Sequence, residues 1–222
     1  MTLVSAHRCL TADRIEAAVA LGADYVEIDV QRCADGSLVL LHDRADEPPP
    51  GTLGYADALE LIAGRIRLHL DLKVEGDEVP IVAQAVARLG ADALLVTTLD
   101  DGGVRAVRDW ADAEGHDLLV GLSLGRGLRD IPLLHAARVR LTELFPAVRY
   151  RMARANLAVA HHWLARLHVR SYARRRRIPL LVWTVDTPKA LAYWMRPGRA
   201  WLVTTNRPEV ALGLRDPARL QP

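Results

Sequence analysis

The stretch Tyr25–Asp43, YVEIDVQRCADGSLVLLHD, decides the fold expected of this chain. Its first half alternates apolar and charged residues, which is the side-chain period of a β-strand. Glu27 and Asp29 are two residues apart and therefore share one face, while the valine and isoleucine residues around them face covering helices. After an Ala-Asp-Gly turn, a second apolar run from Leu38 to Leu41 leads directly to His42.

This placement of charge in an apolar strand predicts a functional site. Two carboxylates on one face of a buried strand are costly to remove from water unless a cation compensates them. Glu27 and Asp29 therefore indicate a metal site, and His42 at the end of the second run is placed to transfer protons beside it. The alternative without a metal is that Arg8 and Lys73 form salt bridges with the two carboxylates.

The rest of the chain alternates strand and helix patterns. Besides the opening stretch, strands are expected at residues 3–7, 66–73, 93–98, 118–123, 157–160, 179–185 and 200–205, and helices at residues 12–21, 57–63, 79–89, 103–114, 163–177, 188–194 and 208–214. Eight strand-then-helix units predict an α/β fold, a (β/α)8 TIM barrel in a single domain over residues 1–222. Active sites of such barrels lie at the C-terminal ends of the strands.

A possible insertion and an alternative fold accompany the barrel prediction. The segment Leu128–Ala155 has a helical pattern interrupted by Pro146, which indicates a helical insertion or a lid. A doubly wound open sheet is the alternative fold, but the sequence lacks the glycine-rich phosphate loop that would support it.

The composition indicates a protein of the cytoplasm. No run of 18 apolar residues is present, and the N-terminus leads straight into a strand, so neither a transmembrane helix nor a signal peptide is expected. Cys9 and Cys33 are too few for a disulfide scaffold and are expected to be reduced thiols.

The charge is distributed unevenly along the chain. Residues Arg138–Arg177 contain 11 Arg and one acid, Glu143, whereas the remainder holds 18 basic and 26 acidic residues. This segment is compatible with a solvated basic face, or with a contact to an anionic membrane surface, because Leu, Trp and Tyr alternate with Arg. Nucleic acid is the least favoured partner, since no recognition module accompanies the charge.

Six short motifs point to a known family. They are AHR (6–8), GADYVEIDV (22–30), DGSLVLLHD (35–43), LDLK (70–73), VWTVD (182–186) and TTNRP (204–208). In this order the chain resembles the glycerophosphodiester phosphodiesterases, a family of metal-dependent barrels. The resemblance implies hydrolysis of small-molecule or lipid phosphodiesters to glycerol 3-phosphate and an alcohol, through attack by a neighbouring hydroxyl and a cyclic phosphate.

The same resemblance assigns roles to residues of the strand ends. It implies that His7 and His42 form the acid–base pair of the reaction. Arg8 and Lys73 would bind phosphate and stabilise its charge, and Trp183 would line the pocket near the alcohol end of the substrate. Whether Trp183 lies in the site or in the core is left open by the sequence.

The resemblance also implies a metal centre. Glu27, Asp29 and Asp71 take the ligand positions, and three carboxylates favour the hard cations Mg²⁺ or Ca²⁺. The family usually carries an HRG…ENT loop whose Glu also binds metal; here the loop is shortened and Cys9 aligns with that Glu. An Asp at position 71 is also similar to the related sphingomyelinase D/phospholipase D toxins, whose disulfide loop is absent here.

These departures leave two alternatives to the hydrolase. One is a cyclising phospholipase D-like lyase acting on lysophospholipids, and the other is a non-catalytic protein that binds phospholipid head groups. Among other residues, the pair Thr205–Asn206 is expected to be structural, as are His161 and His162, because adjacent residues of a strand face opposite ways. His69 faces the same side as Asp71 and is expected to support it.

Overall fold

The structure, a computed structural model, describes residues 1–125 and 146–215. Its described strands include eight parallel ones that form a closed barrel, because they pair in chain order and β1 pairs with both β2 and β9. They are β1 (Leu3–Ala6), β2 (Tyr25–Arg32), β4 (Arg67–Leu72), β5 (Leu94–Thr98), β6 (Leu119–Leu124), β7 (Leu157–His161), β8 (Leu180–Trp183) and β9 (Leu202–Thr205). The predicted (β/α)8 TIM barrel is confirmed.

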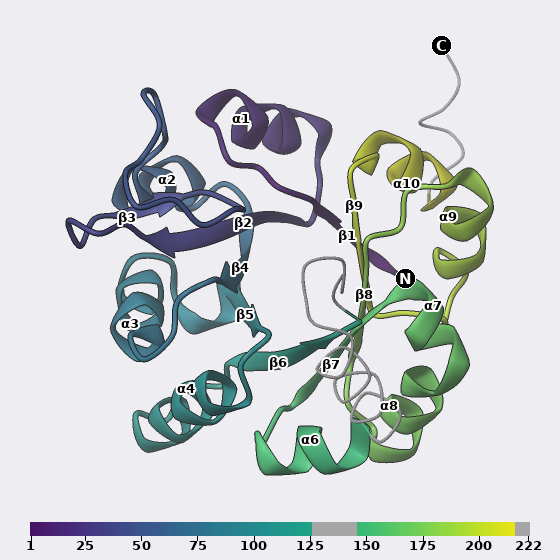
Figure 1. The fold of residues 1–222 in the computed structure, drawn as a ribbon. Coiled ribbons are helices and arrows are strands. Elements are labelled where there is room, and N and C mark those ends of the chain that lie inside the picture. Colours follow the sequence, from purple (N-terminus) through teal and green to yellow (C-terminus); the bar gives the residue numbers. More distant parts are fainter. Residues whose placement is uncertain (126–145, 216–222) are drawn as a thin grey trace, which may run out of the picture.

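Helices surround this barrel on its outer side (Figure 1). They are α1 (Ala12–Leu21), α2 (Tyr55–Ile62), α3 (Glu78–Leu89), the 3-10 turn η1 (Ala91–Ala93), α4 (Asp101–Ala113), α6 (Pro146–Met152), α7 (His162–Leu164), the π-helical turn η2 (Ala165–Val169), α8 (Arg170–Arg176), α9 (Pro188–Trp194) and α10 (Pro208–Arg215). Most of these bounds lie within two residues of those predicted from the sequence pattern.

Local chemistry explains where the first helix begins and ends. The hydroxyl of Thr11 accepts a hydrogen bond from the backbone N–H of Arg14, which caps the start of α1. Gly22 ends the helix in the left-handed conformation, with a φ of 75°, which glycine adopts without steric cost. Between them Ile15 and Ala18 are buried against the barrel.

The alternation of side chains along the strands creates two separate cores. Outward-facing residues such as Val26, Ile28 and Val30 pack in the large cluster between the strands and the helices. Inward-facing apolar residues fill the barrel itself in a second cluster, made of Tyr25, Leu95, Leu157, Val159, Leu181 and Leu202. Gly121 on β6 has to lack a side chain, since an added Cβ would lie 2.3 Å from a methyl group of Val159.

The second half of the opening stretch leaves the barrel. Strand β3 (Leu38–Leu40) pairs with β2 in antiparallel fashion, with Val30 opposite Leu40. The chain therefore runs back alongside β2, where the backbone N–H of Leu41 donates to the carbonyl oxygen of Asp29 at 3.1 Å, and this brings His42 close to the level of Asp29. The apolar run Leu38–Leu41 thus contributes a short strand in addition to the eight barrel strands.

The basic region differs from the prediction in detail. Most of the predicted helical insertion Leu128–Ala155 lies outside the described residues, and its described part contains helix α6, Pro146–Met152. The predicted helix at 163–177 is present as α7, η2 and α8, which follow one another without a break.

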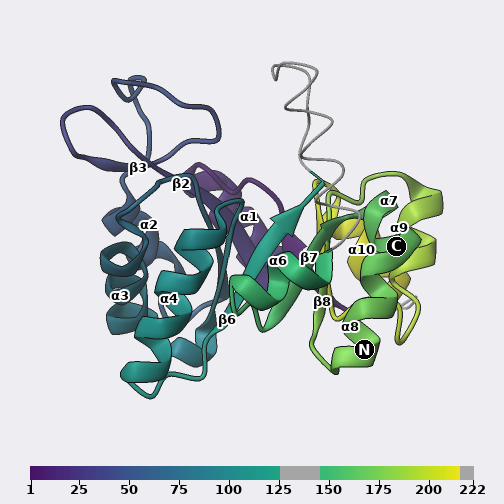
Figure 2. The ribbon, with the colours of Figure 1, turned by 60° about the horizontal axis from the view of Figure 1, so that its bottom comes forward.

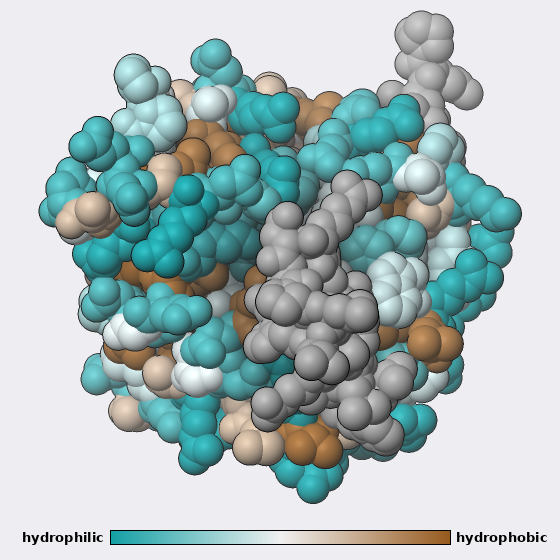
Figure 3. Space-filling view, in the orientation of Figure 1, coloured by the Kyte–Doolittle hydropathy of each residue, from teal (hydrophilic) through white to brown (hydrophobic). Residues whose placement is uncertain are grey.

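The surface of the described residues is mainly hydrophilic on the face shown in Figure 3. Hydrophobic side chains are visible there as separate areas rather than as one continuous face (Figure 3). Within the described ranges, none of the helices combines the length and the apolar character needed to cross a membrane.

Candidate active site

The C-terminal ends of the strands open into a cavity of about 630 Å³. Because all barrel strands are parallel, residues that follow different strands meet at this one mouth. All eight residues to which the sequence assigned a role line the cavity: His7, Arg8, Glu27, Asp29, His42, Asp71, Lys73 and Trp183. The structure thus brings together residues that are separated by up to 176 positions in the chain.

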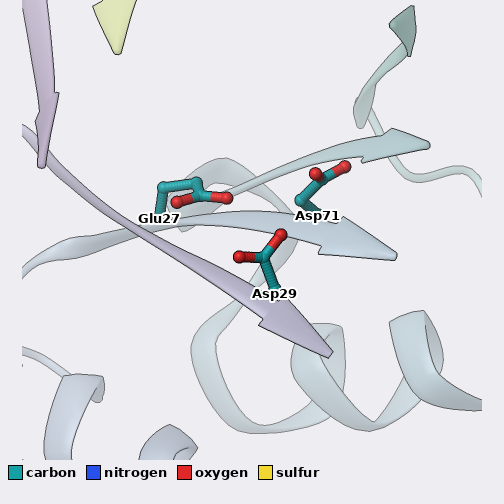
Figure 4. A group of neighbouring side chains, drawn as sticks. All are labelled: Glu27, Asp29 and Asp71. Carbon is teal, nitrogen blue, oxygen red and sulfur yellow. The ribbon is translucent and has the colours of Figure 1, made fainter. Parts of the chain in front are cut away.

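The three carboxylates converge because of strand register. Asp29 on β2 is the direct register partner of Asp71 on β4, and Glu27 lies one inward-facing position before Asp29. Each of the three offers one oxygen to a group whose atoms all lie within 4.8 Å of one another. Figure 4 shows the three side chains directed towards a common space.

Lys73 is bound to two of these carboxylates. Its Nζ lies 3.0 Å from Oδ1 of Asp29 and 2.5 Å from Oδ2 of Asp71. The salt-bridge alternative is therefore half correct: Lys73 pairs with Asp29, but the guanidinium of Arg8 does not pair with Glu27. Instead, the backbone N–H of Arg8 donates to Oε2 of Glu27 at 2.5 Å.

Electrostatics separate the protonation behaviour of the three carboxylates. Burial, together with the charges of Asp29 and Asp71, raises the pKa of Glu27 well above its ordinary value. Burial also raises the pKa of Asp29, more than Lys73 lowers it. Burial acts in the same direction on Asp71, but there the ammonium of Lys73 outweighs it and lowers the pKa. One lysine is thus insufficient to compensate three carboxylates of which two, Glu27 and Asp29, are buried.

The site has the properties of a place for a hard cation. Oδ2 of Asp29 is buried and has no hydrogen-bond partner among the described residues. An unpaired carboxylate oxygen in a buried position is costly, and a divalent cation would remove that cost. Three carboxylates also supply the oxygen ligands that Mg²⁺ and Ca²⁺ prefer, so the residues present fit such an ion.

His42 is held between an acid and a base. Its Nδ1 lies 2.7 Å from Oδ1 of the exposed Asp43, and its Nε2 lies 2.5 Å from Nη2 of Arg8. A guanidinium can only donate and a carboxylate can only accept, so Nδ1 carries the proton and Nε2 the lone pair. His42 is therefore neutral in this arrangement, and Nε2 is the atom that faces Arg8.

Arg8 has an unusual backbone. Its φ is 54°, and the other described non-glycine residues with positive φ are Arg154 and Arg177. The left-handed conformation costs about 1–2 kcal/mol for a residue with a Cβ. At Arg8 this strain accompanies the N–H bond to Glu27, and it turns the chain so that both His7 and Arg8 line the cavity. Such strain is typical of functional sites.

His7 is positioned by two residues that the sequence interpretation did not assign to the site. Its Nδ1 lies 2.9 Å from Oδ1 of Asn206, and Nδ2 of Asn206 donates to Oδ2 of Asp186 at 2.7 Å. The other oxygen of Asp186 accepts from the backbone N–H of Asn206 and from the hydroxyl of Thr205. The expectation that Thr205–Asn206 is merely structural is therefore incomplete, because Asn206 contacts His7 directly.

The orientation of the Asn206 amide determines the tautomer of His7. Because Asp186 only accepts, the NH₂ group of Asn206 has to face it and the amide oxygen has to face His7. His7 therefore donates from Nδ1 and keeps a lone pair on Nε2. Burial lowers the pKa of His7 below 6.5, although the bond to Asn206 opposes this shift. The sequence signal for this contact lay in the motifs VWTVD and TTNRP. Asp186 ends the first motif and Asn206 belongs to the second, and each follows one of two neighbouring strands.

The remaining predicted residues have clear positions. Trp183 forms part of the cavity wall and packs edge-on against His161, with ring centroids 5.6 Å apart. The rings of His161 and His162 lie 4.4 Å apart, so the expectation that they face opposite ways is wrong, because a helix begins at His162. Neither belongs to the three-carboxylate group found among the described residues.

Cys9 does not replace the missing loop glutamate. Its side chain is buried, donates to the carbonyl oxygen of Ala6 at 3.5 Å and does not line the mouth cavity. Burial raises the pKa of this thiol to about 12, so it is protonated and unsuited to bind a cation. The candidate metal site of the described residues therefore has three carboxylates and no fourth protein ligand of this kind.

Comparisons with known proteins agree with the motifs. The model of the Glycerophosphoryl diester phosphodiesterase family matches residues 7–47, which contain five of the eight predicted site residues. No curated protein matches the chain.

Solved structures extend the likeness over the whole chain. A putative glycerophosphoryl diester phosphodiesterase from Agrobacterium tumefaciens aligns with a TM-score of 0.76 and 15% identity, covering 100% of both chains. A glycerophosphodiester phosphodiesterase from Parabacteroides distasonis has a TM-score of 0.72 and 18% identity over 99% of this chain and 98% of the other. A phosphodiesterase from Oleispira antarctica, in complex with the product sn-glycerol-3-phosphate, has a TM-score of 0.71 and 17% identity, with 97% of each chain covered.

At sequence identities of 15–18%, the structural likeness establishes the fold. The family model adds a match in sequence over residues 7–47. The predicted resemblance is confirmed: this chain resembles the glycerophosphoryl diester phosphodiesterase family in sequence over residues 7–47 and in fold over its length.

Proposed function

We propose that this protein is a phosphoric diester hydrolase that converts glycerophosphodiesters to glycerol 3-phosphate and an alcohol. The observation that carries the proposal is the convergence of three carboxylates, two of them buried, and two histidines in one cavity at the C-terminal ends of the strands. The neighbour in complex with sn-glycerol-3-phosphate supports a small phosphodiester as the substrate class.

Glu27, Asp29 and Asp71 would hold the divalent cation, Mg²⁺ or Ca²⁺. When bound, such a cation neutralises charge that develops on the phosphate oxygens. Lys73 lies against the same carboxylates and remains charged: burial alone would lower its pKa, but Asp71 and Asp29 raise it above its ordinary value. It therefore supplies a second positive group on the same side of the phosphate.

The hydrogen bonds of the two histidines assign their roles. His7 has its lone pair on Nε2 and a lowered pKa, so we infer that it accepts the proton of the attacking hydroxyl. His42 keeps its Nδ1–H on Asp43, so we infer that its Nε2, once Arg8 has turned to the phosphate, takes up a proton from solvent and donates it to the leaving oxygen. The two roles are complementary and return each histidine to its starting state when water opens the cyclic phosphate.

Arg8 connects the acid to the substrate. Its Nη2 contacts Nε2 of His42, and its Nε is buried without a partner among the described residues. A guanidinium with an unused donor in a cavity is suited to bind phosphate oxygens. We infer that a bound phosphodiester draws the guanidinium away from His42 and frees Nε2 for proton transfer.

Turnover of glycerophosphocholine tests this proposal. We expect turnover with Mg²⁺ or Ca²⁺ present, and loss of turnover with excess chelator. Glu27→Gln removes one ligand charge and should abolish the metal response, whereas Glu114→Gln, an exposed glutamate at the end of α4, makes the same chemical change away from the site. Full activity in excess chelator would contradict the metal assignment.

We also propose that the basic segment contacts anionic membrane surfaces. Between Pro146 and Arg177 the chain has nine Arg and no acid. Five of these arginines line a surface basin of about 700 Å³, namely Arg151, Arg154, Arg175, Arg176 and Arg177. Arg154 pairs with Asp109 and Asp112, while the other four form no ion pair with a described residue. Met152, which follows the basin residue Arg151 on α6, is 66% exposed.

The position of this basin bears on the substrate. Helix α8 ends at Arg176 and the chain then enters β8, so the basin lies at the N-terminal end of the strands, opposite the mouth. Figure 2 shows α8 at the end of the barrel remote from the β2–β3 hairpin. A membrane bound at the basin leaves the mouth facing away, which favours a freely diffusing diester over a lysophospholipid held in the bilayer. A cytoplasmic location stays a prediction.

A further inference from the structure

A chain of hydrogen bonds crosses the inside of the barrel next to the carboxylates. Oγ of Ser5 on β1 lies 3.4 Å from Nδ1 of His69 on β4, and Nε2 of His69 lies 3.0 Å from Oγ1 of Thr97 on β5. The hydroxyl of Thr97 in turn donates to Oδ1 of Asp71 at 2.8 Å. This series of hydrogen bonds therefore connects strands β1, β4 and β5 and ends on the carboxylate of Asp71.

The direction of these bonds follows from the acceptor at their end. The carboxylate of Asp71 only accepts, so Thr97 has to give its single proton to Asp71. Oγ1 of Thr97 then accepts from Nε2–H of His69, and the remaining lone pair on Nδ1 accepts from Ser5. Each donor in the chain is used once, and His69 has its proton on Nε2.

Packing alone does not explain this arrangement. Ser5, His69 and Thr97 are buried, with 0%, 3% and 1% of their surfaces exposed, inside a barrel that also contains an apolar core cluster. Burying polar groups carries a cost that apolar residues of similar volume would avoid. The bonds of the chain offset that cost, and they end on Asp71.

Asp71 is held at both oxygens as a result. Thr97 donates to Oδ1 while Nζ of Lys73 lies 2.5 Å from Oδ2. Two donors on different oxygens fix the plane of a carboxylate, whereas Lys73 alone, a flexible side chain shared with Asp29, would leave Asp71 free to rotate.

We propose that Thr97 and His69 are positioning residues that fix the carboxylate of Asp71 for a divalent cation. The inference rests on the cation site of the proposed function and extends it to two residues that do not themselves bind the ion. Partners that orient metal ligands in this way typically contribute about 10- to 100-fold to metal affinity.

Titration of the purified full-length chain with Mg²⁺ or Ca²⁺ alone, followed by calorimetry, tests the proposal. We expect Thr97→Val to weaken cation binding about 10- to 100-fold, because valine keeps the shape but lacks the hydroxyl. Thr97→Ser keeps the hydroxyl and should bind close to wild type. His69→Leu should also weaken cation binding. The double variant of His69→Leu and Thr97→Val should bind the cation only slightly more weakly than Thr97→Val, since the hydrogen-bond series to Asp71 is already interrupted in the single variant.

Thr98→Val is the matched control. Thr98 is the next residue of β5, is equally buried and faces the other side of the strand, where its hydroxyl accepts from the N–H of Asp100. This variant should bind the cation like wild type. Thermal unfolding of the metal-free variants separates loss of affinity from loss of fold.

Three results would overturn the proposal: wild-type affinity in Thr97→Val, equal loss in Thr97→Ser and Thr97→Val, or no cation binding by the wild-type chain. The titration contains no diester, so a failure of the proposed hydrolase activity leaves its outcome unaffected. Conversely, diesterase activity with unchanged cation affinity in Thr97→Val would contradict this proposal alone.

Discussion

Nδ1 of His7 lies 2.9 Å from Oδ1 of Asn206, and Asp186 holds the amide of Asn206 in the orientation that makes this contact. The relationship joins the end of the first strand to the residue that follows the last one, across the closure of the barrel. It leaves Nε2 of His7 with a lone pair towards the cavity, which is the state that a general base requires.

Asn206→Ala should reduce kcat about 10- to 100-fold while KM changes little, because the amide orients His7 without touching the substrate. The bond to Asn206 raises the pKa of His7, and burial lowers it. Without the bond the pKa falls further, so the acid limb of kcat/KM should move to lower pH. An unchanged pH profile, with any loss of activity, would assign Asn206 a structural role only.

Replacing either His7 or His42 by Ala should lower turnover about 10²- to 10⁴-fold, the usual contribution of a positioned acid or base. Both line the mouth rather than the core, so the unfolding temperature should change little. His116→Ala, at a loop on the outer side of the barrel, serves as the control. A His7 or His42 variant that unfolds, instead of losing rate, would make that histidine a structural residue.

Glu27→Gln should stabilise the metal-free protein at neutral pH. Burial and the charges of Asp29 and Asp71 raise the pKa of Glu27, so the folded state holds this proton more tightly than the unfolded chain. Between pH 4.5 and the raised pKa the folded state binds more protons, and the free energy of unfolding falls as the pH rises. Glutamine has no such dependence.

Thermal unfolding with and without Mg²⁺ checks this prediction. Wild type should gain stability from the ion, since the folded state binds it and the unfolded chain does not. Glu27→Gln should have a higher unfolding temperature than wild type without the ion, and Mg²⁺ should raise that temperature less. Glu114→Gln should behave like wild type. A metal-free Glu27→Gln that is less stable than wild type at pH 7 would show that the carboxylate is already compensated without a cation.

Binding to anionic vesicles should depend on the arginine basin. Each Arg close to a charged bilayer contributes about 1 kcal/mol, so replacing Arg175–Arg177 by Gln should weaken binding about 10²-fold. Binding should also fall steeply with salt and be lost on neutral vesicles. Replacing Arg105, Arg196 and Arg207, which lie elsewhere on the surface, removes the same charge as a control. An equal loss of vesicle binding in both triple variants would show that net charge, and not the basin, causes the binding. Absence of vesicle binding by the wild-type protein would show that the basin is only a solvated basic surface.

Much of the fold could be predicted because the pattern of the strands is strong. The alternation around Glu27 and Asp29 defines one inward and one outward face, and parallel register then carries Asp29 next to Asp71. The predicted site residues are brought together for the same reason: His7, Arg8, Lys73 and Trp183 follow or end barrel strands, Glu27, Asp29 and Asp71 face inward from β2 and β4, and all strands of a barrel end at one mouth.

The supporting residues could not be predicted in this way. Asn206 and Asp186 come from different loops, and only the closure of the barrel brings them to His7. His69 was expected to support Asp71, but its link through Thr97 depends on the pairing of β4 with β5, in which Asp71 lies opposite Thr97. The contact between Arg8 and His42 depends on a left-handed arginine, a conformation that sequence patterns do not signal.

Phosphorus NMR of glycerophosphocholine during turnover tests the central claim, that the mouth is a metal-dependent hydrolytic site. The diester signal should be replaced by that of glycerol 3-phosphate, with cyclic phosphate present only in passing, and excess chelator should stop the change. Cyclic phosphate that accumulates to completion would contradict hydrolysis and identify a cyclising lyase. No turnover of any diester, with the cation bound, would contradict catalysis altogether and leave a head-group binding protein.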